Sequence, residues 1–189
     1  MPKKVADKKE WLILGYQLFS EQGISGTVIE KLARKLNCNK SSFYWHFNSK
    51  KEFILRMVDF WVESETNYVI DEVNKESIPS KKYKRFIQLV FQHDPYLDFI
   101  FHLKRYAQKH EEIQQIIEEV DNRRLQYTER VFNEFGFPEQ ESKIAASILY
   151  KYLIGYHEMY RYRPPNPDYL KIVNQELKFI LGGKYKLIK

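Results

Sequence analysis

The sequence predicts an all-α protein of about nine helices, with a small N-terminal head and a larger helical body. Apolar residues recur at helical spacing along most of the 189 residues, and no convincing run alternates as a half-buried strand does. Proline- and glycine-containing breaks divide the region after residue 76 into segments of helical length, at 77–80, 93–95, 136–138, 164–167 and 182–183. We therefore expect a head at 1–52 and a body at 53–189.

The segment from Thr27 to Lys50 predicts two short helices joined by a tight turn. Thr27 is expected to cap the first helix, because Glu30 follows at the spacing of a capping box. Asn37 suits a left-handed turn and Cys38 a small apolar plug at the corner, while Asn39 is expected to cap the second helix. The apolar face of the first helix consists of Ile29, Leu32, Ala33 and Leu36.

The second helix, expected at 40–47, buries Phe43 and Phe47, which lie one turn apart. Its remaining side chains can donate hydrogen bonds to phosphates and base edges. They are Lys40, Ser41, Ser42, Tyr44 and His46. Two short helices held at an angle suit insertion of the second into a DNA groove. The alternative is an ordinary helical hairpin whose polar face is only solvated.

The distribution of charge favours the DNA-binding interpretation. The chain has 31 Lys and Arg against 25 Asp and Glu, a formal net charge of +6. Up to Lys51 there are 10 basic and 4 acidic residues, and the remainder has 21 of each, so the whole excess lies in the segment that contains the helix-turn-helix. A basic head on a neutral body is typical of a protein that binds a polyanion.

With these residues in place, the stretch 11–55 resembles the DNA-binding domain of the TetR (tetracycline-repressor-like) family of bacterial transcription regulators. The matching positions are Leu18, Phe19, Glu21, Gly23, Thr27, Ile29, Leu32, Ala33, Tyr44, His46, Phe47 and Lys50. Asn37 and Cys38 depart from the usual Gly-Val of the turn, and Phe43 replaces a smaller aliphatic residue. The resemblance implies a homeodomain-like three-helix head on a helical ligand-binding and dimerisation domain.

Position by position, the resemblance implies a set of DNA-contacting residues. They are Thr27, Lys40, Ser41, Ser42, Tyr44, His46 and Lys50. Simpler roles stay open for three of them: Thr27 as a cap alone, Tyr44 as a packed ring, and His46 as a surface side chain. Four further lysines form either a basic arm that adds sequence-independent attraction or a disordered tail. They are Lys3, Lys4, Lys8 and Lys9.

The body is expected to consist of helices at 50–76, 81–92, 96–109, 111–135, 139–163 and 169–181. The first joins head to body and has an apolar stripe at Ile54, Met57, Trp61 and Tyr68. The apolar face of 111–135 consists of Ile113, Ile116, Val120, Tyr127, Val131 and Phe135.

The helix at 139–163 is apolar on more than one side, so it must be buried on two sides. One side is expected to face a second copy of the chain, with Ala145, Ala146 and Gly155 permitting close approach. The dimerisation residues are predicted to be Ile144, Ile148, Tyr152, Gly155 and Met159. Two copies would reach successive major-groove faces of a palindromic operator, and the resemblance also implies dimerisation through the last two long helices. A central helix of a monomeric bundle is the alternative.

Aromatic residues make up 16% of the chain, with 14 Tyr and 13 Phe, and could enclose a small hydrophobic or aromatic effector. The predicted ligand contacts are Trp61, Glu65, Tyr68, Phe99, His102, Tyr127, Tyr152 and Tyr156. Each can instead belong to the core, because aromatic stripes at helical spacing usually do. The resemblance implies a ligand site in this domain without placing it on particular residues.

Other chemistries find little support in the sequence. The single Cys38 leaves no disulfide framework, and the 5 His show no metal-ligand spacing, so we expect no metal, cofactor or enzymatic activity. No secretory signal or membrane-length apolar run is present, which favours the cytoplasm. We therefore expect a ligand-released transcriptional repressor. The alternatives are an activator or DNA-binding protein without an inducer, and a helical enzyme or interaction module with an incidental basic head.

Overall fold

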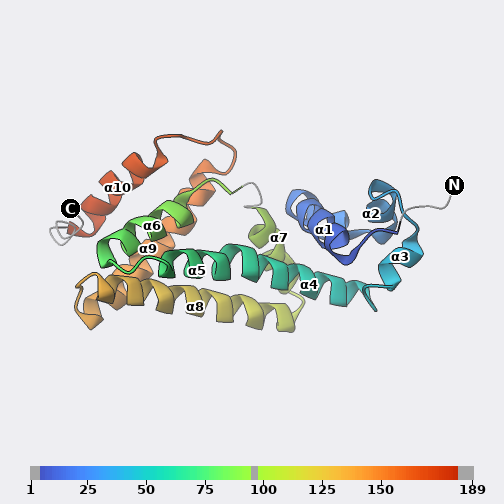
Figure 1. Cartoon of the computed structure of the whole chain (residues 1–189), viewed down its shortest axis with the longest axis horizontal. Helices are drawn as coiled ribbons and strands as arrows, with labels where there is room; N and C mark the ends of the chain where they lie inside the picture. The colour runs from blue at the N-terminus through green and yellow to red at the C-terminus, as the bar shows by residue number, and fades with distance from the viewer. Residues whose placement is uncertain (1–4, 95–97, 183–189) are drawn as a thin grey trace. The chain divides into compact units, whose positions relative to one another are not determined.

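The computed structural model describes residues 5–94 and 98–182, and their regular structure is helical throughout, without a strand. Figure 1 shows the order of the helices. Their bounds are α1 Lys8–Gln22, α2 Ile29–Lys35, α3 Lys40–Tyr44, α4 Lys50–Val62, α5 Tyr68–Asn74, α6 Pro79–Phe91, α7 Asp98–Ala107, α8 Glu111–Glu134, α9 Glu139–Tyr160 and α10 Tyr169–Ile180. The all-α prediction is confirmed, with a helix-turn-helix in the N-terminal part.

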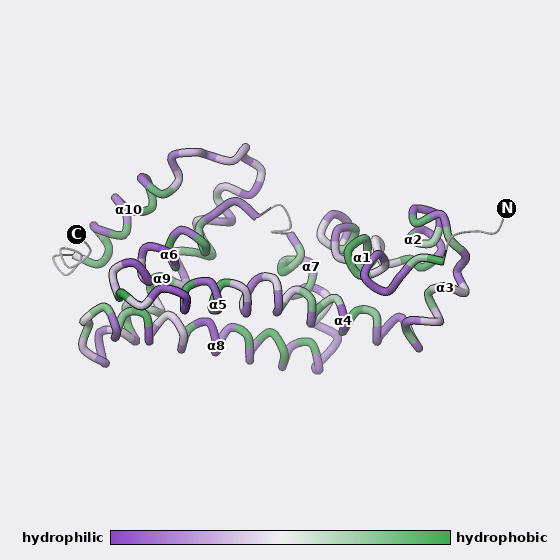
Figure 2. The backbone as a smooth tube through the Cα atoms, viewed as in Figure 1, coloured by the Kyte–Doolittle hydropathy of each residue, from purple (hydrophilic) through white to green (hydrophobic). Residues whose placement is uncertain are grey.

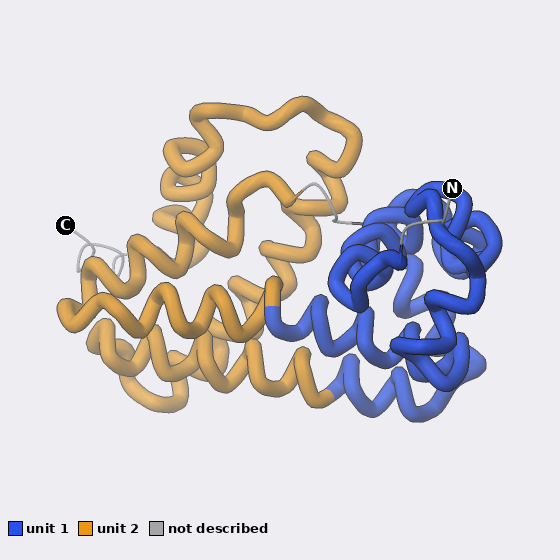
Figure 3. The backbone as a smooth tube through the Cα atoms, turned by 45° about the vertical axis from the view of Figure 1, so that its right-hand side comes forward, with its two compact units in different colours: residues 1–63, 95–118 blue, residues 64–94, 119–189 orange. Residues whose placement is uncertain are grey.

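The chain divides into two compact units, shown in Figure 3. The first contains residues 1–63 and 95–118, and the second contains 64–94 and 119–189. Helix α8 begins in the first unit and ends in the second, so its residues serve two cores. The first unit includes α7 as well as the helix-turn-helix, while the functional boundary expected after residue 52 stays a prediction.

The core of the first unit is built from aromatic rings. Asp7 starts α1 with a capping box, in which its side chain accepts from Glu10 N at 2.7 Å. Buried Trp11 then meets Phe43 of α3 edge-on, with ring centroids 5.3 Å apart, and Phe43 meets Phe53 of α4 at 5.2 Å. Edge-to-face pairs of this kind fix the angles between helices as well as burying apolar surface. The rings therefore hold α3 rigidly against α1 and α4.

Helix α7 packs on α1 within the same unit. Phe99 is buried and stacks on Tyr16 at 4.3 Å, with Phe19 5.0 Å away. At the end of α1 the backbone of Gly23 has a φ of 61°, and a Cβ there would lie 2.8 Å from Nδ1 of His102. Both the backbone conformation and this close approach favour glycine.

The predicted helix at 50–76 forms, but residues Glu63–Asn67 adopt a π-helix between α4 and α5. Ile54, Met57 and Trp61 are buried as predicted, whereas Tyr68 is exposed, so its place in the stripe was wrong. A π-helical turn adds a residue and rotates the face that follows. The buried residues are Thr66 within the π-helix and Val73 after it, which fits such a rotation.

The second unit has its own apolar core, in which Tyr83 of α6 packs against Phe132 of α8 and against Phe135, which directly follows α8. The predicted apolar face of α8 is confirmed except at Ile116, which is half-buried while Ile117 is buried. Figure 2 shows the alternation of hydrophobic and hydrophilic residues along α8. Among the described residues, no helix is long and apolar enough to cross a membrane.

Candidate nucleic-acid interface

A tight turn joins α2 to α3. Asn37 has a φ of 52°, the left-handed conformation predicted for it, and Cys38 is buried at the corner. The backbone N–H of Cys38 donates to the carbonyl of Ala33 at 3.0 Å, which closes the end of α2. Asn39 occupies the N-cap position of α3 as predicted, but its side chain makes no capping bond.

The second helix of the motif, α3, is shorter than predicted and ends at Tyr44. A hydrogen bond of 3.0 Å from Phe47 N to the Phe43 carbonyl continues its course by one turn. Both phenylalanines are fully buried, as predicted, and their ring centroids lie 5.0 Å apart. One face of α3 is thus fixed in the core, and the opposite face is available to a partner.

Four neighbouring positions form the exposed face of α3, namely Lys40, Ser41, Tyr44 and Trp45. Tyr44 is 50% exposed and Trp45 69% exposed. Trp45 was not among the residues predicted from the sequence. The sequence did contain a signal for it, because Trp45 does not share the helical spacing of the buried Phe43 and Phe47. A large apolar side chain that is directed to solvent often marks a binding surface.

Ser42 does not face outward, which corrects its predicted place in the groove. Its side chain is 3% exposed. The hydroxyl donates to the carbonyl of Ala6 at 3.2 Å and accepts from Trp11 Nε1 at 3.5 Å. Ser42 precedes Phe43 on the face that packs on α1, so its polar group serves the interior.

His46 lies at the edge of this face and is half-buried. Its Nε2 lies 2.9 Å from the same carbonyl of Ala6, a residue that is fully buried. His46 therefore holds the N-terminal segment in place, a role the sequence did not indicate. A phosphate contact by this side chain stays a prediction.

Thr27 is neither exposed nor a helix cap. It is fully buried and ends the 3-10 helix Gly23–Thr27, where its hydroxyl donates to the carbonyl of Ile24 at 2.8 Å. The N-cap of α2 is Val28, so the predicted capping box was wrong. A phosphate contact by Thr27 stays a prediction.

Lysines frame the motif at both ends. Lys40 Nζ of α3 lies 2.5 Å from Glu30 Oε1 of α2, and this hydrogen bond raises the pKa of Lys40 and lowers that of Glu30. Lys50 is the first residue of α4, whose N-cap Ser49 accepts from Glu52 N at 3.1 Å. Because the cap fixes the start of α4, it also fixes the backbone position of Lys50.

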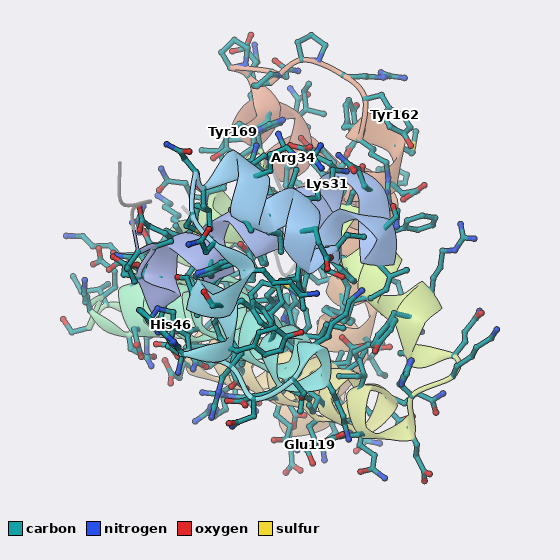
Figure 4. The ribbon with its side chains drawn as sticks, turned by 90° about the vertical axis from the view of Figure 1, so that its right-hand side faces the viewer. Lys31, Arg34, His46, Glu119, Tyr162 and Tyr169 are labelled. Carbon is teal, nitrogen blue, oxygen red and sulfur yellow. The ribbon has the colours of Figure 1, made fainter. Side chains whose placement is uncertain are left out.

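A second group of cations lies on α2 and was not predicted as part of the site. It consists of Lys31, Arg34 and Lys35. Lys31 and Arg34 are labelled in Figure 4, and Lys31 donates to the side chain of Gln22. Their spacing of three and four residues places them on neighbouring positions of a helix, a signal that was available in the sequence.

The predicted basic arm lies only partly within the described residues, because Lys3 and Lys4 fall outside them. Lys8 and Lys9 are the first residues of α1 rather than members of an arm. The Lys8 ammonium lies 5.7 Å from the centre of the Phe47 ring, so it is close to the helix-turn-helix.

The predicted ligand contacts are not gathered into one cavity. Trp61 and Phe99 belong to the core of the first unit, and His102 packs beside Gly23 there. In the second unit Tyr127 is buried with its hydroxyl 3.0 Å from Asn74 Oδ1. The others lie in the second unit, with Tyr68 exposed and Glu65, Tyr152 and Tyr156 half-buried. Their roles as ligand contacts stay predictions.

The predicted dimerisation residues lie mostly on one exposed stripe of α9. The stripe consists of Ile144, Ile148, Gly155 and Met159. Tyr152 shares this side of the helix by its spacing but is half-buried, because its ring packs on Phe91 at 5.4 Å and its hydroxyl bonds to Glu176. Ala145 and Ala146 are buried in their own unit, so the expectation that they permit approach of a second copy was wrong.

Within residues 5–94 and 98–182, no three His, Cys, Asp or Glu side chains come together as metal ligands would. The described site presents hydrogen-bond donors and cations around an exposed helix. Such a surface suits the phosphates and base edges of a nucleic acid.

Comparison with known proteins also shows that the N-terminal part is similar to DNA-binding regulators. Residues 14–57 match the family described as bacterial regulatory proteins, tetR family. Over 60 residues the chain is 35% identical to the biofilm operon icaADBC HTH-type negative transcriptional regulator IcaR of Staphylococcus aureus. That match covers 32% of this chain and 32% of IcaR, so the chain spans about a third of the relative's length.

Solved structures share the fold along nearly the whole chain. SCO4454, a TetR-family transcriptional regulator from Streptomyces coelicolor, has a TM-score of 0.74 at 12% identity and covers 96% of this chain and 90% of its own. A transcriptional regulator from Saccharomonospora viridis in complex with choline has a TM-score of 0.73 at 16% identity, covering 92% and 94%. At these identities the likeness concerns the fold alone.

Proposed function

We propose that this chain is a tetR-family regulator, a DNA-binding repressor that acts through its N-terminal helix-turn-helix and that a small effector releases. The observation that carries the proposal is the family match at residues 14–57, which coincides with a rigidly held α3 whose outer face is open. We therefore propose a cytoplasmic protein whose function is DNA binding and not an enzymatic reaction.

The proposed contacts on DNA follow from what α3 and its neighbours expose. Lys40, Ser41 and Tyr44 would meet the major groove and its phosphates, with Lys50 on a further phosphate. Trp45 adds an apolar surface that suits the methyl group of thymine. The cations of α2, Lys31, Arg34 and Lys35, would add attraction that does not depend on sequence.

Dimerisation is proposed through the exposed α9 stripe. Met159 is 70% exposed and Ile148 39% exposed, although both are apolar and share one side of the helix. A Cβ added to Gly155 would meet no atom of the described residues within 4 Å, so a second helix could approach closely there. Two-fold pairing of this stripe would give a dimer suited to a palindromic operator.

Repression and release by an effector are the remaining parts of the proposal. IcaR, whose name describes a negative regulator, supports the sign of regulation. The S. viridis regulator was crystallised with choline, which supports a body that admits small molecules. An effector releases DNA only if it binds the non-binding conformation more tightly than the DNA-binding one.

The test is a DNA-binding titration with the full chain and operator DNA selected from a random duplex library. We expect Tyr44→Ala and Lys50→Ala to weaken binding, and Lys50→Ala to reduce the slope of log affinity against log salt by about 0.9, one phosphate contact. Lys81→Ala, at an exposed position of α6, is the matched control and should leave both quantities unchanged. Unchanged affinity in both head variants, or no selected sequence at low salt, would overturn the proposal.

A further inference from the structure

A cavity of about 270 Å³ lies in the first unit, where the early turns of α4 meet the end of α7 and the start of α8. None of the predicted DNA or ligand contacts lines it. Its volume is just below the range of about 300–1,000 Å³ typical of sites for drug-sized ligands. The cavity therefore suits a compound of about one ring.

The lining of the cavity combines apolar and aromatic side chains with charged ones. Ile54 of α4 and Ile113 of α8 are both buried and form part of its lining. Tyr106 and His110 present stacked rings to it, with centroids 3.9 Å apart and planes inclined by 19°. A planar ring can lie against such a surface with more contact than a branched chain of equal volume can.

The charged groups around the cavity differ in whether they have an ion-pair or hydrogen-bond partner. Lys51 Nζ lies 2.7 Å from Glu112 Oε2, so this lysine and this carboxylate largely satisfy each other. In the part of the chain that the structure describes, Lys109 has no side-chain partner, and neither imidazole nitrogen of His110 has a hydrogen bond. Glu111 is the remaining acid, and it is exposed at the first position of α8.

The start of α8, which forms part of the lining, adds backbone donors. The carbonyl of His110 accepts from Ile113 N at 3.0 Å and from Gln114 N at 3.2 Å. The amides of Glu111 and Glu112, which precede these, have no acceptor within their own helix. They lie at the positive end of a helix of 24 residues, which favours a negative group over a positive one.

We propose that this cavity binds a small planar aromatic carboxylate, a molecule of the benzoate class. The ring lies against Tyr106 and His110, and the carboxylate is directed to Lys109, His110 and the first amides of α8. Glu111 opposes an anion, but one exposed carboxylate is outnumbered by these donors. The residues named here all belong to one compact unit.

Occupation of the cavity bears on the head through α4. Lys51 and Leu55 line the cavity, and Lys50, the proposed phosphate contact, is the residue before Lys51. A ring inserted beside the first turns of α4 therefore changes the position that α4 prefers relative to α7 and α8. The role of the aromatic acid as an effector rests on the proposed DNA-binding function, whereas its binding to the cavity does not.

The binding test uses calorimetry on the full chain without DNA, with benzoate, benzyl alcohol and benzylamine as probes. Benzoate should bind at least tenfold more tightly than benzylamine, with benzyl alcohol between them. Leu55→Trp, which fills the cavity, should abolish benzoate binding, and Lys109→Gln should weaken it at least fivefold. Lys104→Gln, on α7 but outside the cavity, is the matched control. Circular dichroism verifies that each variant folds.

Three outcomes overturn the site: no binding of benzoate, equal binding of benzylamine, or benzoate binding that Leu55→Trp leaves intact. A second experiment repeats the operator titration with and without benzoate. We expect a change in operator affinity of at least fivefold in the natural chain and none in Leu55→Trp. Benzoate binding without that change removes the effector role. Failure of all DNA binding with benzoate binding retained removes the proposed function and leaves the site.

Discussion

The side chain of His46 holds the backbone of Ala6, with Nε2 lying 2.9 Å from the carbonyl oxygen. A carbonyl oxygen can only accept, so Nε2 must carry the proton and donate it. The Ser42 hydroxyl donates to the same oxygen at 3.2 Å. Two side chains of the helix-turn-helix thus anchor the segment that leads into α1.

We predict that His46→Ala lowers the free energy of unfolding by about 1–2 kcal/mol, because the buried Ala6 carbonyl loses a donor. Urea unfolding measures the change, and His93→Ala, at an exposed position, is the control. If His46→Ala weakens operator binding while the unfolding free energy stays the same, the side chain acts on DNA and not as an anchor.

The neighbouring serines should separate stability from DNA binding. Ser42→Ala is expected to cost about 1 kcal/mol of unfolding free energy and leave operator affinity nearly unchanged, because its hydroxyl is buried. Ser41→Ala should do the reverse, since Ser41 is exposed on α3. Parallel unfolding curves and operator titrations distinguish the two. An equal loss of operator affinity in both would contradict the assignment of Ser42 to the interior.

In the head, the sequence predicted the orientation of large apolar side chains well. It predicted the orientation of polar side chains less well, because a polar group can choose between several hydrogen-bond partners. Helical spacing identified Phe43 and Phe47 correctly, because burying large rings leaves few arrangements. The hydroxyls of Thr27 and Ser42 were predicted to face DNA, yet each has a nearby backbone carbonyl. Short polar side chains take such local acceptors readily, and a sequence pattern does not show which acceptor will be near.

In the body, helix lengths were predictable but the phase of a long helix was not. Tyr68 was expected on the stripe begun by Ile54, and the π-helix Glu63–Asn67 displaced it. No residue in that segment breaks a helix, so the sequence carries no signal for the extra residue in the turn. The cavity at the α4, α7 and α8 ends was missed as well, because its lining comes from segments far apart in the chain.

Gly26 should tolerate no side chain. A Cβ there would lie 2.0 Å from the carbonyl oxygen of Leu18, which is backbone and cannot move aside alone. We predict that Gly26→Ala destabilises the protein by at least about 2 kcal/mol, the cost of forcing atoms into a packed site. Thermal unfolding would show this as a lowered Tm. Ser25→Ala, at the adjacent exposed position, should change the Tm little, and a Gly26→Ala protein as stable as that control would refute the close approach.

Glu65, in the π-helix, should make stability depend on pH. Burial raises its pKa to about 7, helped by the charge of Asp94 and opposed by Arg124. The folded protein then binds a proton that the unfolded chain releases near its usual value of 4.5. Stability should therefore fall as pH rises from about 4.5 to about 7, by up to about 3 kcal/mol, and level off above that.

The measurement for Glu65 is a series of urea unfolding curves between pH 5 and pH 8. Glu65→Gln, which has no proton to lose, should remove most of the decline and be more stable than the natural chain at pH 8. Glu63→Gln, at the exposed neighbouring position, controls for the change in net charge. A Glu65→Gln protein with the same pH dependence as the natural chain would show that Glu65 is ionised throughout.

The α9 stripe provides the last prediction. Ile148→Asp places a charge at the centre of the apolar surface proposed to meet a second copy, where it would be buried without a partner. We expect a monomer in sedimentation equilibrium at concentrations where the natural chain is a dimer, together with a large loss of operator affinity. Ile78→Asp is the control, because Ile78 is similarly exposed but caps α6. A dimer that survives Ile148→Asp but is lost in Ile78→Asp would move the interface away from α9. Loss of the dimer with full operator affinity would instead show that one head suffices to bind DNA.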